Sequence, residues 1–369
     1  KYVKNWDYFL NLANEHGIIA LCWYNLTKTS NSNNVSTGQM EILHSYYLKN
    51  LLRNTFLFKQ LEEIASLSEK ENIRIVLLKG LALERTVYGN KGIRQMNDID
   101  LLVSKDKAVL LRKILLNNGF ESAPLVSSFH EKIMPVYGKH LPEMYKNGIA
   151  VEIHFNLFNQ KDNSITEDLL DKTIILCENE PCIYQPDPFL FFLYLVKHLN
   201  WHETNGMSQL RLYVDLLFLL SHYYDQIINE QLRDYSERVS LWNTLCEKLI
   251  ILNLIWGVPL PECITGSFRE YDIEKIKDIF VRFLRSHTKD KLEEKHEDLF
   301  KLLNEVPDLK NKFLLILGHI FPSITYIRYR YKIRTRSGAI LYIPVRWVNQ
   351  LGRIITILNQ KSGNAKITR

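Results

Sequence analysis

Two acidic residues interrupt an otherwise aliphatic run at Asp98-Ile99-Asp100-Leu101-Leu102-Val103. The run predicts a β-strand, in which side chains two positions apart point to the same face of the sheet. Both carboxylates therefore share one face, while Ile99 points into the core. Neighbouring carboxylates on a half-buried strand repel each other and lose hydration, and a divalent cation removes that cost. The spacing therefore predicts half of a metal site.

A third carboxylate lies on a second predicted strand, Val151-Glu152-Ile153-His154. Alternation places Glu152 and His154 on one face, so Glu152 is the candidate that completes the site with Asp98 and Asp100. Carboxylate oxygens are hard ligands, and we expect Mg²⁺ or Mn²⁺. The alternative is that the two aspartates are solvent-facing residues of an edge strand. His154 could order Glu152 or contact substrate, and its alternative is a histidine that only packs.

A strand ending at Leu78 is followed by Lys79-Gly80. A glycine there lets backbone N–H groups approach a phosphate at a helix N-terminus, and Lys79 adds a positive charge. The alternative is that Gly80 only permits a tight turn. Arg94 could bind a β- or γ-phosphate through two parallel hydrogen bonds, or it could orient one of the aspartates.

These residues together resemble the nucleotidyltransferase superfamily that includes DNA polymerase β. That pattern is a glycine after a strand, an Asp-hydrophobic-Asp strand and a third carboxylate on a later strand. The chain resembles more closely the bacterial uncharacterised nucleotidyltransferase family. Its members share Leu-Lys-Gly, an arginine shortly before Asp-Ile-Asp, and Glu-hydrophobic-His. The chain departs from the superfamily in having Leu81 after Gly80, where Gly-Gly or Gly-Ser is common.

The resemblance implies an α+β fold, with a polymerase β-like nucleotidyltransferase core of a small mixed sheet and helices. We expect an N-terminal helical segment over residues 1–71, the core over 72–160, a C-terminal helical domain over 186–325, and a basic amphipathic tail over 326–369. The resemblance also implies which residues act. Asp98, Asp100 and Glu152 would bind metal and carry catalysis, and the nucleotide would be bound by Lys79, Gly80, Arg94 and His154.

The implied reaction is metal-dependent transfer of a nucleoside monophosphate from an NTP, ATP by default, with release of pyrophosphate. The acceptor would be a hydroxyl or phosphate of a small molecule, sugar, peptide or protein. One alternative is a non-catalytic nucleotide- or partner-binding module that keeps the fold, although three clustered carboxylates argue against it. Another is a nucleic-acid nucleotidyltransferase, which the slightly acidic body and the lack of an RNA-binding motif disfavour.

Composition is that of an ordinary globular protein, with 369 residues of which 46% are hydrophobic and 24% charged. No apolar run approaches the roughly 20 residues of a membrane helix, and the N-terminal residues contain no apolar signal core. The five cysteines are scattered, which fits reduced thiols better than a disulfide framework. We therefore expect a cytoplasmic protein.

The net charge of +6 is unevenly distributed. Residues 326–369 contain ten of the 47 Lys and Arg and no Asp or Glu, so the remainder carries 37 basic against 41 acidic residues. Alternation of aromatic and cationic residues from Tyr326 to Arg336 fits a strand or a helix. The tail could bind nucleic acid, anchor on an anionic membrane surface, or draw a triphosphate or phosphorylated acceptor into the cleft. Alternatively, it is a terminal helix pair that only packs on the domain.

Hydrophobic periodicity predicts the other elements. Asn147-Gly148 predicts a hairpin between strands at 140–145 and 149–155. Predicted helices cover 6–26, 40–70, a segment from Lys79 to near Gly89, 105–118, 189–201, 209–224, 240–256, 273–286 and 292–304.

Two of the C-terminal helices carry paired polar residues four positions apart. On the first, His198 and His202 have no third ligand at a zinc spacing. On the second, Arg211 and Asp215 predict an ion pair. Cys177 and Cys182 lack the second cysteine pair of a zinc site. The family resemblance extends to these helices, which would then line the nucleotide pocket.

Overall fold

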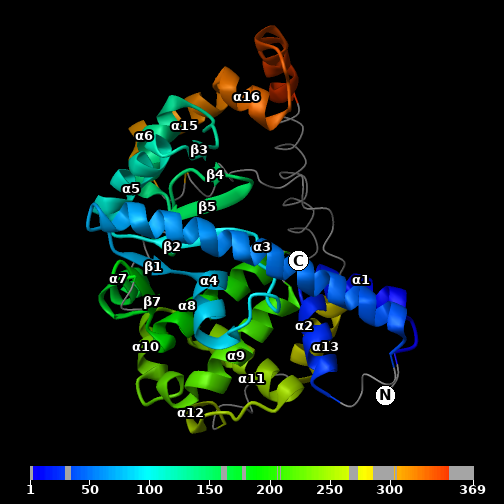
Figure 1. Cartoon of the computed structure of the whole chain (residues 1–369). Helices are drawn as coiled ribbons and strands as arrows, with labels where there is room; N and C mark the ends of the chain where they lie inside the picture. The colour runs from blue at the N-terminus through cyan, green and yellow to red at the C-terminus, as the bar shows by residue number, and fades with distance from the viewer. Residues whose placement is uncertain are drawn as a thin grey trace, which may run out of the picture. The chain divides into compact units, whose positions relative to one another are not determined.

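The computed structural model describes residues 3–29, 35–158, 164–176, 180–205, 207, 209–265, 273–285, 303 and 306–348. Their contacts group into two compact units (Figure 1). The first unit contains residues 1–121 and 143–295, and the second contains 122–142 and 296–369. The four-part division expected from the sequence is not tested by this grouping and stays a prediction.

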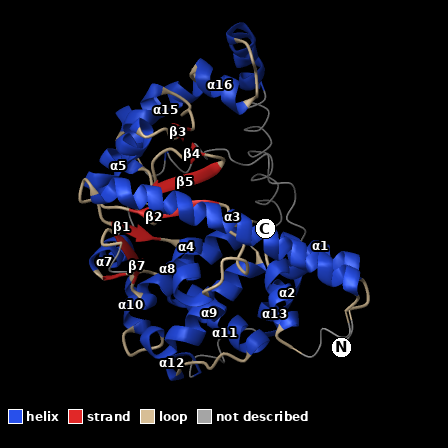
Figure 2. Ribbon diagram, viewed as in Figure 1, coloured by secondary structure: helices blue, strands red, loops and turns tan. Residues whose placement is uncertain are grey.

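A mixed sheet forms the framework of the first unit (Figure 2). The strand order is β3-β4-β5-β2-β1-β7-β6. β1 runs antiparallel to β2 and parallel to β7, and β2 runs parallel to β5. The strands are β1 Ile75–Leu77, β2 Asp98–Leu102, β3 Glu121–Ser122, β4 Met144–Lys146, β5 Ile149–His154, β6 Thr173–Ile175 and β7 Ile183–Pro186.

Alternation along β2 and β5 separates an aliphatic from a polar face. Ile99 and Leu101 on β2, and Val151 and Ile153 on β5, are almost fully buried. α3 (Thr37–Glu69) contacts both strands. A capping box at Ser36 begins this long helix, because the serine hydroxyl and the Gln39 side chain satisfy each other's backbone N–H groups. The sheet therefore has a hydrophobic core on one side and polar side chains on the other.

Glycines end several helices where the sequence predicts them. The helix after Lys79 consists of α4 (Lys79–Leu83) and a π-helical turn (Glu84–Tyr88), and it ends at Gly89 with φ +59°. The predicted single helix over 6–26 is wrong, because Gly17 at φ +69° separates α1 (Trp6–Glu15) from α2 (Ile19–Thr27). The turn between β4 and β5 has positive φ at both Asn147 and Gly148, as predicted.

Helices make up the rest of the first unit. Asp187 caps α8 and Pro188 takes its first position, as the sequence suggests. α8 packs against α9 and α11. These helices are α5 Lys105–Asn117, α7 Ser164–Asp171, α8 Pro188–Thr204, α9 Leu210–Ile227, α10 Leu232–Arg238, α11 Trp242–Trp256, α12 Glu262–Thr265 and α13 Ile273–Arg285.

The second unit is helical. α6 (Ser128–Tyr137) packs on α15 (Leu309–Ile320) around a core of buried Ile133, Val306 and Leu315. α16 (Ile324–Arg330) and a helix over 336–348 follow. The first part of the basic tail is therefore helical, which settles the open choice between strand and helix. Residues 349–369, and the predicted helix over 292–304 apart from residue 303, lie outside the described residues.

Several helices and strands were missed or misplaced by the sequence interpretation. The strand predicted over 140–145 begins only at Met144, and β6, β7, α6, α7, α10, α12 and α15 were not predicted. Strands of three or four residues, such as β6 and β7, are too short to show a clear period. The four cysteines within the described residues are free thiols, and Cys177 lies outside them. No helix in the described ranges has both the length and the hydropathy needed to cross a membrane.

Candidate active site

The pairing of β2 with β5 brings the predicted carboxylates together. The two strands are parallel, with Asp100 opposite Glu152 and Leu102 opposite His154. Asp98 lies two residues before Asp100 and therefore on the same face. Side chains from two strands that are about fifty residues apart in sequence thus meet on the polar side of the sheet.

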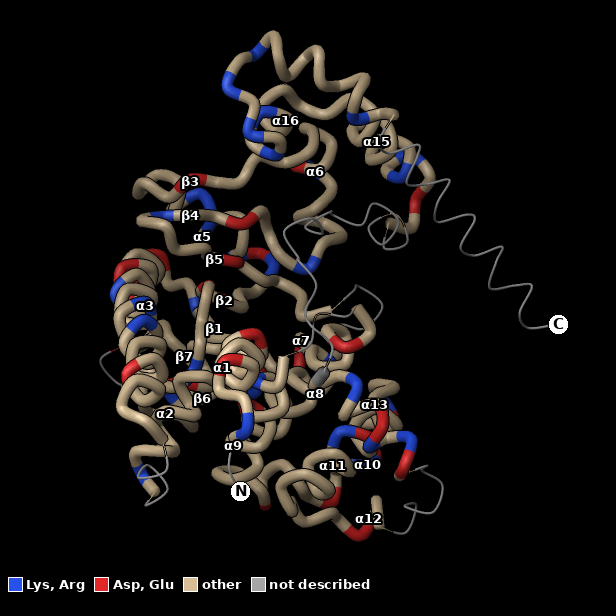
Figure 3. Tube along the Cα trace, turned by 90° about the vertical axis from the view of Figure 1, so that its right-hand side faces the viewer, with Lys and Arg blue, Asp and Glu red and all other residues tan. Residues whose placement is uncertain are grey.

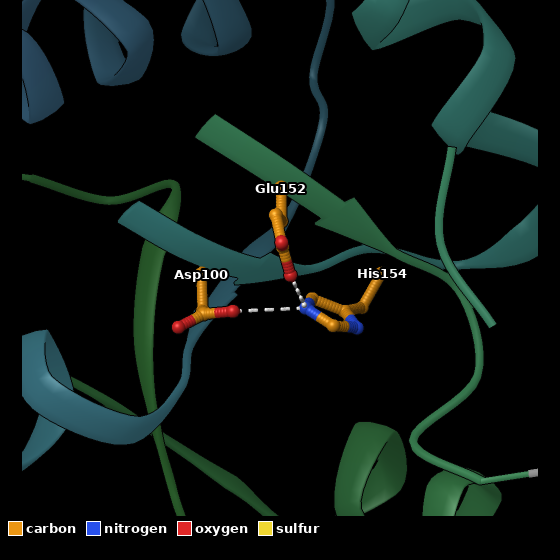
Figure 4. A group of neighbouring side chains, drawn as sticks. All are labelled: Asp100, Glu152 and His154. Atoms are coloured by element: carbon orange, nitrogen blue, oxygen red, sulfur yellow. Dashed lines mark hydrogen bonds and ion pairs between the residues drawn. The ribbon is translucent and has the colours of Figure 1, made fainter. Parts of the chain in front are cut away.

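His154 connects two of the carboxylates. Its Nε2 atom lies 2.9 Å from Asp100 Oδ1 and 3.3 Å from Glu152 Oε2 (Figure 4). Burial lowers the pKa of His154, but the hydrogen bonds to Asp100 and Glu152 outweigh it and the pKa lies above its ordinary value. The imidazole therefore lies within hydrogen-bond distance of both side chains, and its role in the site stays a prediction.

Lys79 approaches the same carboxylate oxygen. Its Nζ atom lies 2.6 Å from Asp100 Oδ1. Burial raises the pKa of Asp100, but Lys79 and His154 reverse this effect and the pKa lies below its ordinary value. Lys79 has φ +46°, in the left-handed region that residues with a Cβ seldom adopt. Such strain at the junction of β1 and α4 is typical of a functional position.

Asp98 has a different environment. No hydrogen bond or ion pair reaches its carboxylate from the described residues. Repulsion from Asp100 and partial burial raise its pKa to about 6. A cation bound at this face would relieve that repulsion.

The described residues contain one group of three side chains with metal-ligand geometry, namely Asp100, Glu152 and His154. One ligand atom from each lies within 4.8 Å of the others. Asp98 is outside this group but on the same face of β2. The donor set of oxygens and one imidazole nitrogen is compatible with a divalent cation.

Arg94 is engaged within the protein. Its Nε and Nη2 atoms donate to the two carboxylate oxygens of Asp215 on α9, at 2.8 and 2.7 Å. Tyr88 donates to the same carboxylate at 2.9 Å. The predicted ion pair between Arg211 and Asp215 is wrong, because Asp215 faces Arg94 while Arg211 donates to the carbonyl of Gln95.

Gly80 is required by close packing. A Cβ atom there would lie 2.5 Å from Arg94 Nη1 and 2.8 Å from Met96 Sδ. The glycine therefore lets the segment before β2 pack onto α4. A phosphate-binding role for the N–H groups near Gly80 is a separate matter and stays a prediction.

α8 contributes side chains that the sequence interpretation did not assign to the site. Tyr194 interacts electrostatically with Lys79, Asp100 and Glu152, and burial raises its pKa. Burial, together with the charge of Lys79, holds the pKa of His198 well below its ordinary value. Tyr194, His198 and His202 follow one another on α8 at spacings of four residues. The ring centroids of His198 and His202 lie 4.4 Å apart. The spacing of the histidines was visible in the sequence, and the family resemblance implied that this helix lines the nucleotide pocket, but the position of Tyr194 beside the carboxylates was not visible.

Comparison with known proteins identifies the family. Residues 3–257 match the family described as uncharacterised nucleotidyltransferase. The chain belongs to this family. The match confirms the resemblance inferred from Leu-Lys-Gly, Asp-Ile-Asp and Glu-Ile-His, and the observed α+β fold with its mixed sheet agrees with it.

Other comparisons add little to this assignment. No curated protein sequence matches the nucleotidyltransferase. Among solved structures, it is similar to the crystal structure of ANT(2″)-Ia in complex with adenylyl-2″-tobramycin. The similarity has a TM-score of 0.33 and 10% sequence identity, and it covers 51% of this chain and 94% of that chain.

Proposed function

We propose that the protein transfers a nucleoside monophosphate from an NTP, with ATP as the default donor, in a reaction that depends on Mg²⁺ or Mn²⁺. The acceptor would be a hydroxyl or phosphate of a small molecule, sugar, peptide or protein. The observation that carries the proposal is the parallel register that places Asp100 opposite Glu152, with His154 within hydrogen-bond distance of both.

The side chains present fit a divalent cation. Asp98, Asp100 and Glu152 would hold it, because their carboxylates share one face and the pKa of Asp98 is already raised by the repulsion of Asp100. When bound, such an ion neutralises charge on the phosphates and lowers the pKa of the attacking hydroxyl. His154 would keep Asp100 and Glu152 in orientation, as side chains that hydrogen-bond to metal ligands do in other metal sites.

The reaction balances without a further reactant. The acceptor oxygen forms a bond to the α-phosphorus, the bond from that phosphorus to the bridging β-phosphate oxygen breaks, and pyrophosphate leaves. Glu152 is the group proposed to receive the acceptor proton. Lys79 lies beside Asp100 and would face the phosphates as a positive charge.

Pyrophosphate release tests this proposal. The purified protein is incubated with each labelled NTP, Mg²⁺ and a panel of acceptors. Loss of several kcal/mol of charge stabilisation corresponds to about a thousandfold in rate, so we expect that reduction for Asp98→Asn and Asp100→Asn. The matched control is Asp106→Asn, because Asp106 is exposed on α5. Equal pyrophosphate release by wild type and both site variants would refute the proposal.

Calorimetry separates the enzyme from a non-catalytic binding module. We expect NTP to bind more tightly in the presence of Mg²⁺, and Asp100→Asn to weaken this dependence. NTP binding that is indifferent to Mg²⁺, without pyrophosphate release, would favour the binding module.

A further inference from the structure

The second unit exposes an apolar helix face. α15 is apolar around most of its circumference, and Leu315 and Gly318 on one side are buried. The opposite side repeats large apolar residues at spacings of four, three and four, which places them on one helix face. They are Leu309, Phe313, Ile316 and Ile320, with exposures of 82%, 62%, 40% and 42%.

A second exposed stripe adjoins the first. In the helix over 336–348, Leu341 and Val348 are 76% and 69% exposed. Trp347 of this helix donates its indole N–H to the Ile320 carbonyl at 2.6 Å, and its ring meets Phe321 edge-on at 5.9 Å. The C-terminal end of α15 and the helix over 336–348 are therefore joined by a hydrogen bond and an aromatic contact. We call their exposed apolar side chains the apolar surface.

Positive charges predominate in the chain from α15 onward, after the Asp308 that caps the N-terminus of this helix. From residue 309 to 369 the chain contains 12 Lys and Arg and no Asp or Glu. Four exposed cations lie between residues 328 and 336, in the segment from α16 to the last helix (Figure 3). They are Arg328, Lys332, Arg334 and Arg336.

We propose that the apolar surface and its cations bind an anionic lipid bilayer from the side, without crossing it. A bilayer interface uses both properties at once, because apolar side chains enter the acyl boundary while cations meet the lipid phosphates. A nucleic acid would engage the cations but would leave Leu309, Phe313 and Leu341 in water. The positive charge of these side chains complements the negative charge of anionic lipid headgroups.

Vesicle flotation of the full chain tests the proposal. We expect the protein to float with vesicles of equal parts phosphatidylglycerol and phosphatidylcholine, and to remain below vesicles of phosphatidylcholine alone. Each cation near an anionic surface is worth about fivefold in partitioning, so Arg334→Gln/Arg336→Gln should reduce the partition coefficient by at least about tenfold. Phe313→Ser/Leu341→Ser should reduce it by a similar factor.

The matched control substitutions lie in the first unit. Leu52→Ser and Lys59→Gln replace exposed residues of α3, and we expect them to leave flotation unchanged. Circular dichroism must show that all variants keep the wild-type melting curve. We expect this because the substituted side chains are exposed. The proposal is overturned if wild type fails to float with anionic vesicles, if it floats equally with neutral ones, or if folded variants of both kinds bind as well as wild type. Retention on RNA without flotation would assign the cations to nucleic acid instead.

Discussion

Asp100 Oδ1 accepts hydrogen bonds from both Lys79 and His154 in the free protein. This oxygen is also a proposed metal ligand, so the Lys79 ammonium and a divalent cation compete for it. We predict that Lys79→Met tightens Mn²⁺ binding in the absence of nucleotide by about tenfold, because one competing charge near the surface is removed. The same variant should raise the apparent KM for NTP, since Lys79 would no longer face the phosphates.

Calorimetry of Mn²⁺ binding checks the first effect and steady-state kinetics the second. Lys59→Met, on the exposed side of α3, is the control for loss of one positive charge. Unchanged Mn²⁺ affinity in Lys79→Met would show that the lysine does not compete with metal.

His130 makes the stability of the second unit depend on pH. Burial and the nearby charge of Arg346 lower its pKa from the ordinary 6.5 to about 4. The native state therefore keeps His130 neutral where the unfolded chain binds a proton, so stability is full above about pH 6.5 and falls as pH drops toward 4. The free energy of unfolding is therefore about 2 kcal/mol lower at pH 5 than at pH 7.

Hydrogen exchange of the α6 and α15 amides, corrected for intrinsic rates, measures this dependence. Between pH 7 and pH 5, the free energy of unfolding should fall by about 2 kcal/mol less in His130→Gln than in wild type. Parallel pH profiles for the two proteins would argue that His130 is not the titrating group.

At the scale of elements, a buried ion pair fastens α9 to the segment that leads into β2. Arg94 and Asp215 are 5% and 1% exposed, and Asp215 also accepts from Tyr88. Removing one partner leaves a buried charge uncompensated, whereas removing both charges does not. We predict that Asp215→Asn lowers the free energy of unfolding by about 3 kcal/mol, and that Arg94→Met/Asp215→Leu recovers much of this loss.

Urea denaturation of the single and double variants provides the test. The exposed pair of Arg233 and Glu237 on α10 is the matched comparison, and Glu237→Gln should leave the free energy of unfolding nearly unchanged. Additive losses in the double variant would mean that the two residues do not act as a pair.

These elements show which features of the fold and of the candidate site can be predicted from the sequence. Alternation in Asp98-Ile99-Asp100 and in Glu152-Ile153-His154 sets which side chains share a face, and local turn chemistry predicts the hairpin at Asn147-Gly148. Neither pattern contains the partner of Arg94, because Asp215 lies 121 positions away, on α9. The position of Tyr194 beside the carboxylates depends on how α8 packs, which no local period encodes.

At the scale of the whole molecule, the candidate active site and the basic C-terminal stretch belong to different units. The candidate active site lies in the first unit and contains the cations Lys79 and Arg211, the latter interacting electrostatically with Asp98. The uniformly basic stretch belongs to the second unit. The sequence alone left open whether this stretch draws nucleotide into the cleft or meets an anionic surface.

Charge variants distinguish these two roles better than a truncation. Cutting the chain after Ser323 would remove Arg346 and Trp347, which donate to the last carbonyls of α15, and would disturb packing together with charge. Arg334→Gln/Arg336→Gln changes charge alone at exposed positions. If these cations serve a lipid surface, the KM for NTP measured without vesicles should stay within about twofold of wild type at both 20 and 200 mM salt. A KM that rises at 20 mM salt and returns to the wild-type value at 200 mM would instead give them the role of attracting the triphosphate, because only a long-range interaction is screened over that interval.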